Sequence, residues 1–341
     1  MAETIVVAKR GEYIESRHTG SIAVVDEKGN LLFGIGDVQR LTFSRSSLKP
    51  VQAIPLIQSG AADRYLFNDK EIAVCCASHN GEEQHTQVVE SILFRLGLGA
   101  EHLQCGIHPP YSHESYLTLL KRGGEPTPVH NNCSGKHAGM LALALHLQSD
   151  AARYHHADHP VQRKVAEAVS ELSGVAGEEL QTAIDGCGVP TFALPLDKLA
   201  YMYARLSNPA SLESNLTRLA VKRITQAMVR YPEMVSGTNE FCTDVMRTCG
   251  GKVLAKGGAE GVYCLGLLDR GIGIAIKVED GTPRASYPAA AEALKQLGVL
   301  TPQEEEMLHA YRLPAIKNRR GETVGRLEPV FQLKGVKCTE M

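Results

Sequence analysis

The chain has 341 residues and a formal net charge of −2, with 43% hydrophobic and 22% charged residues, the composition of a folded globular protein. No cluster of Lys and Arg is present, which argues against a nucleic-acid partner because binding DNA or RNA requires phosphate neutralisation. No apolar segment approaches the ~20 residues that span a bilayer, and the N-terminus lacks the pattern of a secretory signal, so we expect no membrane partner.

The predicted elements divide the chain into strand-like ends and a helical middle. Runs of apolar or β-branched residues between turns predict strands at 5–8, 21–26, 31–34, 252–256, 262–268, 271–278 and 324–333. Apolar residues at helical spacing predict helices at 83–96, 134–147, 160–172, 195–206 and 212–230. We expect Ser134 to act as an N-cap, since serine is favoured there.

This order predicts an α+β fold with an antiparallel sheet built from both chain ends and flanked by helices. The expected sheet domain comprises 1–45 and 240–341, and the expected mainly helical domain comprises 46–239. In such an arrangement we expect the active site in the crevice between the two lobes.

The nine cysteines are an odd number and are scattered along the chain, which favours a reducing cytoplasm over a disulfide scaffold. Their thiols are then buried, catalytic or metal-bound. A nucleotide-dependent enzyme is disfavoured because Gly34-Ile35-Gly36 lacks the third glycine of a dinucleotide loop, and no phosphate-binding loop motif occurs.

The first candidate for chemistry is the Ser-x-x-Lys segment from Ser46 to Lys49. On a helix, side chains three positions apart share a face, so the amine is within reach of the hydroxyl. A lysine with a pKa lowered by burial accepts the proton of a serine and makes it a nucleophile. Alone this spacing is more often an exposed helix face than a catalytic pair.

Two later segments shift the balance from an exposed helix face towards a catalytic serine–lysine pair. Ser78 and Asn80 form Ser-x-Asn, and Lys256 begins Lys-Gly-Gly. Individually they are a turn serine and a lysine at a strand end. In this order the three motifs resemble those of penicilloyl serine transferases and serine β-lactamases, in which the second serine and lysine relay a proton to the leaving group.

A third candidate pairs Cys133, Lys136 and His137 with Cys187, each cysteine in a polar setting next to glycine. Thiolates bind zinc, and His137 or a neutral Lys136 provides a third ligand. Spacing alone favours buried structural cysteines, or a catalytic thiol with a pKa lowered by the Lys136 charge.

Two charged residues suit recognition of an α-amino acid. Arg45 offers a bidentate fork to a carboxylate, and Asp185 pairs with an ammonium group. Either residue is equally explained by a structural ion pair. His137 joins Arg45 and Asp185 as the third candidate for binding substrate.

Five blocks of the sequence resemble the L-asparaginase II family of the Rhizobium etli type. They are SRSSLKP (44–50), ASHNGE (77–82), HNNCSGKHAGML (130–141), DGCGVP (185–190) and AKGGAEG (255–261). The resemblance implies a fold similar to serine β-lactamases and glutaminases, and hydrolysis of L-asparagine to L-aspartate and ammonia. It also implies that the protein forms a homodimer.

The same resemblance implies roles for individual residues. Ser46 with Lys49 and Ser78 with Lys256 form two Ser–Lys pairs, with Ser46 as nucleophile and Lys49 as its base. It further implies a zinc ion held by three residues, with water completing the shell. These ligands are Cys133, Lys136 and Cys187.

Two other functions remain open from the sequence. The first is a glutaminase or another small-amide hydrolase, because one extra methylene changes binding by only about 1–3 kcal/mol. The second is an amino-acid-binding or zinc-binding protein without catalysis. The paired serines and lysines weigh against this second function, since a binding protein needs no activated serine.

Overall fold

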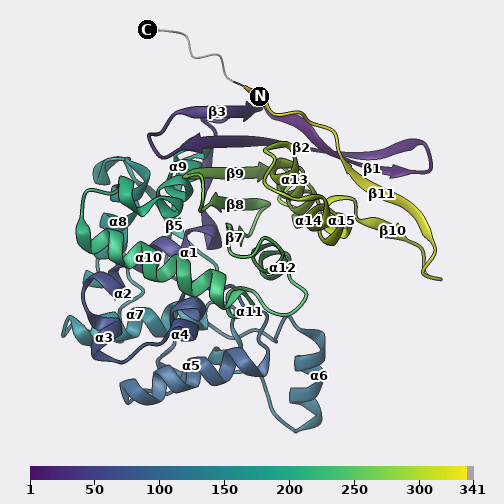
Figure 1. Ribbon diagram of the computed structural model, residues 1–341. Helices are drawn as coiled ribbons and strands as arrows, with labels where there is room; N and C mark the ends of the chain where they lie inside the picture. Colours follow the sequence, from purple (N-terminus) through teal and green to yellow (C-terminus); the bar gives the residue numbers. More distant parts are fainter. Residues whose placement is uncertain (336–341) are drawn as a thin grey trace. The chain divides into compact units, whose positions relative to one another are not determined.

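The structure is a computed structural model that describes residues 1–335 (Figure 1). Its contacts group the chain into two units. The sheet unit contains Met1–Ser47, Leu194–Ser211 and the described residues from Asp244 onward, and the helical unit contains Leu48–Ala193 and Leu212–Thr243. Residues 336–341 of the predicted 240–341 segment lie outside the described residues.

The sheet unit contains an antiparallel sheet built from both ends of the chain, as predicted. Its strands follow the order β10-β11-β1-β2-β9-β8-β7, and β3 pairs with both β2 and β12. They are β1 (Glu3–Arg10), β2 (Tyr13–Asp26), β3 (Leu31–Ile35), β7 (Val253–Gly258), β8 (Val262–Leu267), β9 (Ile272–Val278), β10 (Ala315–Lys317), β11 (Thr323–Pro329) and β12 (Lys334–Gly335). Strand β2 joins the two ends, because Ile22 lies opposite Ile276 of β9. The predicted α+β class is confirmed.

Helix α9 (Leu196–Ser207) belongs to the sheet unit, although the sequence analysis placed it in the helical domain. It packs on β9, β2 and β8. A Cβ atom on Gly273 of β9 would lie 1.9 Å from the carbonyl oxygen of Ala200, so the helix backbone rests directly on the strand. Glycine permits this approach because it has no side chain.

The other elements of the sheet unit are short, apart from helix α13, which packs on β8, β9 and β11. They are β4 (Leu41–Phe43), η1 (Arg45–Leu48), η5 (Pro209–Ser211), α13 (Pro283–Gln296), α14 (Pro302–Met307) and α15 (His309–Arg312). Helix α12 (Phe241–Thr248) contains the boundary between the units.

The helical unit is organised around α7, whose residues from Ser134 to Ala144 are all buried. Its helices are α1 (Lys49–Gln52), α2 (Ile54–Gln58), α3 (Ala61–Arg64), α4 (Asp69–Cys75), α5 (Glu83–Leu96), α6 (His113–Lys121), α7 (Ser134–His146), α8 (Pro160–Ser173), α10 (Asn215–Arg230) and α11 (Pro232–Val235). A hairpin of β5 (Gln181–Ile184) and β6 (Pro190–Pro195) and the short turns η2 (Ala100–His102), η3 (Pro128–His130) and η4 (Gly177–Glu179) complete it.

The start of α7 differs from the prediction. The N-cap position is occupied by Cys133, without a capping side chain, and Ser134 is the first residue inside the helix. The Ser134 hydroxyl instead donates to the carbonyl of Val129, at 2.9 Å. The prediction of Ser134 as N-cap was therefore wrong by one residue, because a tertiary acceptor was available to the hydroxyl.

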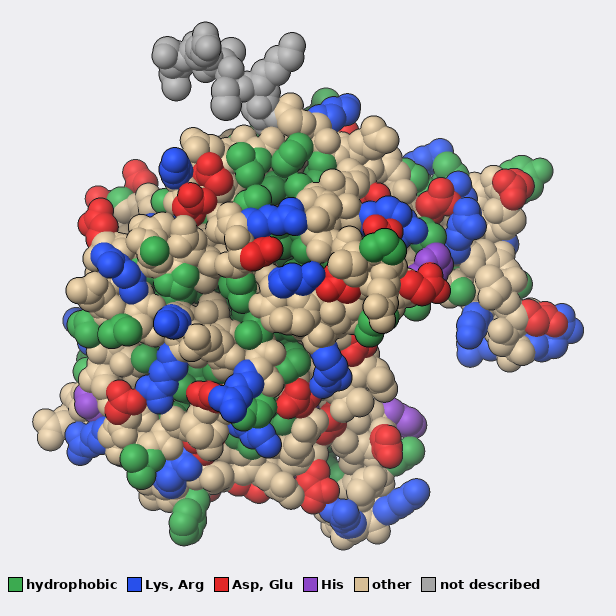
Figure 2. Space-filling model, in the orientation of Figure 1, with side chains coloured by type: hydrophobic (Ala, Val, Ile, Leu, Met, Phe, Trp, Pro, Cys, Tyr) green, Lys and Arg blue, Asp and Glu red, His purple; other side chains and the backbone are tan. Residues whose placement is uncertain are grey.

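Charged side chains are dispersed over the face of the molecule shown in Figure 2. On the face shown in Figure 2, Lys and Arg side chains are interspersed with Asp and Glu side chains. Among residues 1–335, no helix combines the length and apolar character that crossing a membrane requires.

Candidate active site

Lys49 lies at the centre of a buried polar cluster in the helical unit. It is the first residue of α1 and is 1% exposed. Its Nζ atom is 2.5 Å from the carbonyl oxygen of Ala77, 2.9 Å from Ser78 Oγ and 3.1 Å from Cys133 Sγ. The structure therefore brings Lys49 and Ser78, from two separate motifs, into hydrogen-bonding contact. It also brings Cys133, from the third motif, into contact with Lys49.

Ser78 lies in the loop between α4 and α5, and backbone contacts fix that loop. The N–H of Ser78 donates to the carbonyl of Val235 at 2.9 Å, and the N–H of Asn80 donates to that of Ser236 at 3.0 Å. The loop is also attached to α7 through His79, whose Nε2 is 2.9 Å from Ser134 Oγ. Since the Ser134 proton goes to Val129, His79 Nε2–H is the donor in this bond.

Cys133, Lys136 and Cys187 come together as the sequence suggested. Lys136 Nζ is 3.0 Å from Cys187 Sγ, and the two thiols are hydrogen-bonded to each other. Cys187 is held by the β5–β6 hairpin, in which the N–H of Asp185 donates to Val189 and the N–H of Gly188 donates to Asp185, both at 2.9 Å. Gly188 has φ +86°, a conformation that glycine adopts without strain.

The electrostatics of this cluster favour a thiolate. The hydrogen bond from Cys187, together with the electrostatic effect of Lys49 and Lys136, lowers the pKa of Cys133 well below that of an ordinary thiol. That same hydrogen bond, and burial, raise the pKa of Cys187. Burial lowers the pKa of Lys136, but the negative charge of the thiols outweighs burial and the pKa is raised. The arrangement is a buried Cys133 thiolate in contact with Lys49 and close to Lys136.

Asp185 and His137 border the same cluster. Asp185 Oδ2 is 3.7 Å from Cys187 Sγ. His137, on α7, is fully buried, and burial lowers its pKa to about 4, so the imidazole is neutral. Its Nδ1 atom is 2.6 Å from the hydroxyl of Tyr154, a residue that the sequence analysis did not identify. No local sequence pattern distinguishes Tyr154 from a tyrosine of the apolar core.

The remaining three predicted site residues lie in the sheet unit. Arg45 and Ser46 are in η1, both partly buried, and Arg45 has φ +49°. Lys256 lies on β7, is 2% exposed and donates to the carbonyl of Gly257 at 2.8 Å. A Cβ on Gly258 would be 3.1 Å from the carbonyl oxygen of Ser44. The end of β7 is therefore packed against the turn that carries Ser46.

The turn itself is held from two sides. The hydroxyl of Ser47 donates to the carbonyl of Ser44 at 2.6 Å, and Tyr203 of α9 donates its hydroxyl to the carbonyl of Ser47 at 2.6 Å. The Ser-x-x-Lys segment thus spans η1 and the start of α1 in helical conformation, as the spacing predicted.

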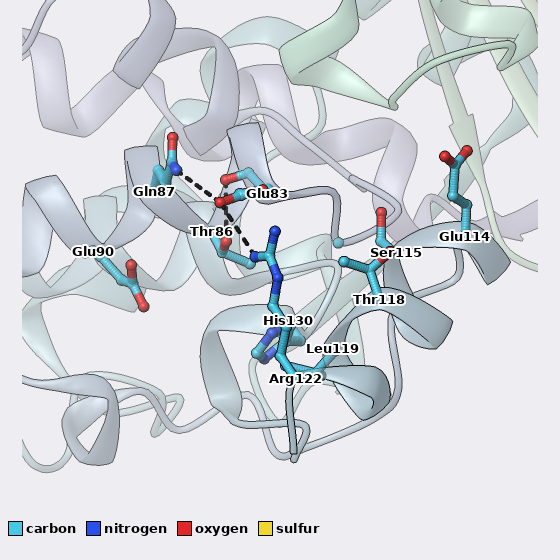
Figure 3. A pocket seen from close by; sticks show the side chains of 11 residues that line it. Glu83, Thr86, Gln87, Glu90, Glu114, Ser115, Thr118, Leu119, Arg122 and His130 are labelled. Carbon is cyan, nitrogen blue, oxygen red and sulfur yellow. Dashed lines mark hydrogen bonds and ion pairs between the residues drawn. The ribbon is translucent and has the colours of Figure 1, made fainter. Parts of the chain in front are cut away.

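A pocket of about 420 Å³ lies elsewhere in the helical unit, between α5 and α6 (Figure 3). Its charged lining includes Glu83, which is 3.6 Å from Arg122, and Glu90 and Glu114. None of the predicted site residues lines it. Its side chains include no lysine or cysteine, so we assign the chemistry to the cluster around Lys49.

Comparison with known families and structures gives a family match over most of the chain. The model of the family described as L-asparaginase II matches residues 6–329. Comparison with curated proteins gives no match.

Several solved structures are similar at low identity. A β-lactamase (Mb2281c) from Mycobacterium bovis is 13% identical, with 82% of this chain and 95% of that chain covered and a TM-score of 0.44. A protein named Mglu, in its native form, is 16% identical, with 82% and 65% covered and a TM-score of 0.38. A LovD6 mutant of simvastatin synthase from Aspergillus terreus is 12% identical, with 86% and 91% covered and a TM-score of 0.39.

Proposed function

Because the chain belongs to the L-asparaginase II family, a family of amide hydrolases, we propose that it hydrolyses L-asparagine to L-aspartate and ammonia. The observation that carries a serine–lysine mechanism is the 2.9 Å contact between Lys49 Nζ and Ser78 Oγ in a buried cluster. This buried contact places the Lys49 amine within hydrogen-bonding distance of a serine hydroxyl, as proton exchange between the two groups requires.

In the proposed first step, Lys49 accepts the proton of Ser46, and Ser46 Oγ attacks the side-chain amide carbon of asparagine. The C–N bond then breaks, and Ser78, supplied with a proton by Lys256, protonates the departing ammonia. The product is an aspartyl ester of Ser46. Water then attacks this ester, aspartate leaves, and the proton returns to Ser46. Arg45 pairs with the substrate carboxylate, and Asp185 with its ammonium group.

The buried thiols support a second part of the proposal, a bound zinc ion. Within residues 1–335 no group of three or more His, Cys, Asp and Glu side chains is placed to hold a metal, so a metal at the thiols needs Lys136 as its third ligand. The donor set would fit zinc, since Cys133 favours its thiolate form, and Lys136, which contacts Cys187, would lose its proton on binding the metal. Zinc held by Cys133, Lys136 and Cys187 would supply a fixed positive charge that orders the two thiols and the substrate.

Two serine variants test the mechanism. Ser46→Ala is expected to abolish ammonia release, whereas Ser78→Ala slows it, because general acid catalysis contributes about 10²–10⁴-fold. In rapid mixing of the wild type, ammonia should appear in a burst ahead of aspartate as the acyl-enzyme accumulates. Turnover by Ser46→Ala near the wild-type rate removes Ser46 as nucleophile. A higher kcat/KM with glutamine than with asparagine overturns the substrate assignment.

A further inference from the structure

Tyr154 is a buried residue that the proposed mechanism does not use. It lies between α7 and α8 and is 0% exposed. Its hydroxyl contacts two groups, the backbone N–H of Gln104 at 2.8 Å and His137 Nδ1 at 2.6 Å. The side-chain amide of Gln162 donates to the Tyr154 carbonyl at 2.9 Å, which fixes the backbone that carries the ring.

These contacts determine where the protons lie. A tyrosine hydroxyl has one proton, and the N–H of Gln104 already donates to its oxygen. Within the described part of the chain, the acceptor within reach of that proton is His137 Nδ1. Nδ1 therefore carries no proton, and the neutral imidazole of His137 must carry its proton on Nε2.

Because Nδ1 is bonded to the Tyr154 hydroxyl, Nε2 is the ring nitrogen left to interact with a second group. Nε2 is buried and has no partner in full hydrogen-bond geometry among residues 1–335. The ring interacts instead with the side chain of Cys187. In the tautomer that Tyr154 imposes, Nε2 carries the N–H that is available to the Cys187 side chain. In the opposite tautomer, Nε2 would carry a lone pair, which would repel the thiolate that Cys187 becomes on binding zinc.

We propose that Tyr154 is a positioning residue that fixes His137 as an N–H donor to Cys187 and so holds this sulfur ready to bind zinc. The inference rests on the zinc site of the proposed function. Groups that hydrogen-bond to metal ligands orient them and raise affinity, and their loss typically weakens metal binding 10–100-fold. Tyr154 acts through His137 and does not touch the metal.

The variant Tyr154→Phe tests the inference through two readouts other than activity. Long-range ¹H–¹⁵N NMR of the metal-free protein should show His137 as the Nε2–H tautomer in the wild type, and a population of Nδ1–H in Tyr154→Phe. Competition with a chromophoric chelator should show zinc binding weakened 10–100-fold. Tyr311→Phe is the matched control, because it deletes a tyrosine hydroxyl that donates to Asp244 in the sheet unit, at 2.5 Å. Its zinc affinity should equal that of the wild type.

A double-mutant cycle separates action through His137 from general damage. In the His137→Gln background, adding Tyr154→Phe should weaken zinc binding no further. The inference is overturned if Tyr154→Phe weakens zinc binding equally in both backgrounds, or if it leaves the zinc affinity unchanged. It is also overturned if His137 of the wild type is the Nδ1–H tautomer. A wild type that binds no zinc refutes the zinc site instead, and the NMR result still decides whether Tyr154 sets the tautomer.

Discussion

The packing of α4 against α7 gives a prediction that connects stability to activity. Gly135, in the first turn of α7, has no room for a side chain, since a Cβ there would lie 2.2 Å from the carbonyl oxygen of Val74 in α4. Ordinary van der Waals contact begins at 3.4 Å, so Gly135→Ala must separate the two helices by roughly 1 Å. Overpacking costs about 1–3 kcal/mol, and the better helix propensity of alanine returns about 1 kcal/mol. We expect the free energy of unfolding to fall by up to about 2 kcal/mol.

Activity should fall more than this loss of stability explains. Lys49 bridges Ser78, which follows α4, and Cys133, which precedes α7, at 2.9 and 3.1 Å. Separating these helices by roughly 1 Å breaks one of the two contacts, and a misplacement of this size costs about 10²-fold in rate. Urea denaturation measures the free energy of unfolding, and ammonia release by the folded variant measures the rate.

The control for this variant is Gly177→Ala. Gly177 has no atom within 4 Å of an added Cβ, so the substitution should leave activity unchanged and alter stability by less than about 1 kcal/mol. A Gly135→Ala protein with wild-type stability and turnover would refute the reasoning. It would mean that the α4–α7 interface relaxes without moving the groups that Lys49 connects.

Three further predictions follow from the charges of the site. Lys49→Met removes the proposed base, so kcat for ammonia release should fall by about 10²–10⁴-fold with the fold retained by circular dichroism. Because Cys187 and the lysine charges lower the pKa of Cys133, the ultraviolet thiolate band should persist below pH ~8 in metal-free protein, and Lys136→Met should move its titration to higher pH. Burial lowers the pKa of His79 well below its usual range, so the unfolded chain binds that proton first as pH falls. The free energy of unfolding should therefore decrease below pH ~6.5, and less steeply in His79→Gln; an identical slope would contradict this.

Local patterns in the sequence were sufficient for most of the secondary structure. The helices predicted at 83–96 and 160–172 match α5 and α8 to within one residue, and the strands near both ends match the sheet. Helix α13 was missed because Pro288 interrupts its pattern, although its run of alanines favours a helix. Hydrophobic periodicity succeeds where an element buries one face, because this spacing is a property of neighbouring residues.

The sequence by itself also determined which chemical groups are available: two serines, three lysines and two thiols in an order that matches the family. The tertiary structure decided how they are partnered. The contact of Lys49 with Ser78 and Cys133, and the chain from Tyr154 through His137 to Cys187, join residues far apart along the chain. Such contacts depend on how whole helices pack, as at Gly135, where the absence of one methyl group sets the distance between α4 and α7. Nothing in the neighbourhood of a single residue encodes that distance, because both packed surfaces define it together.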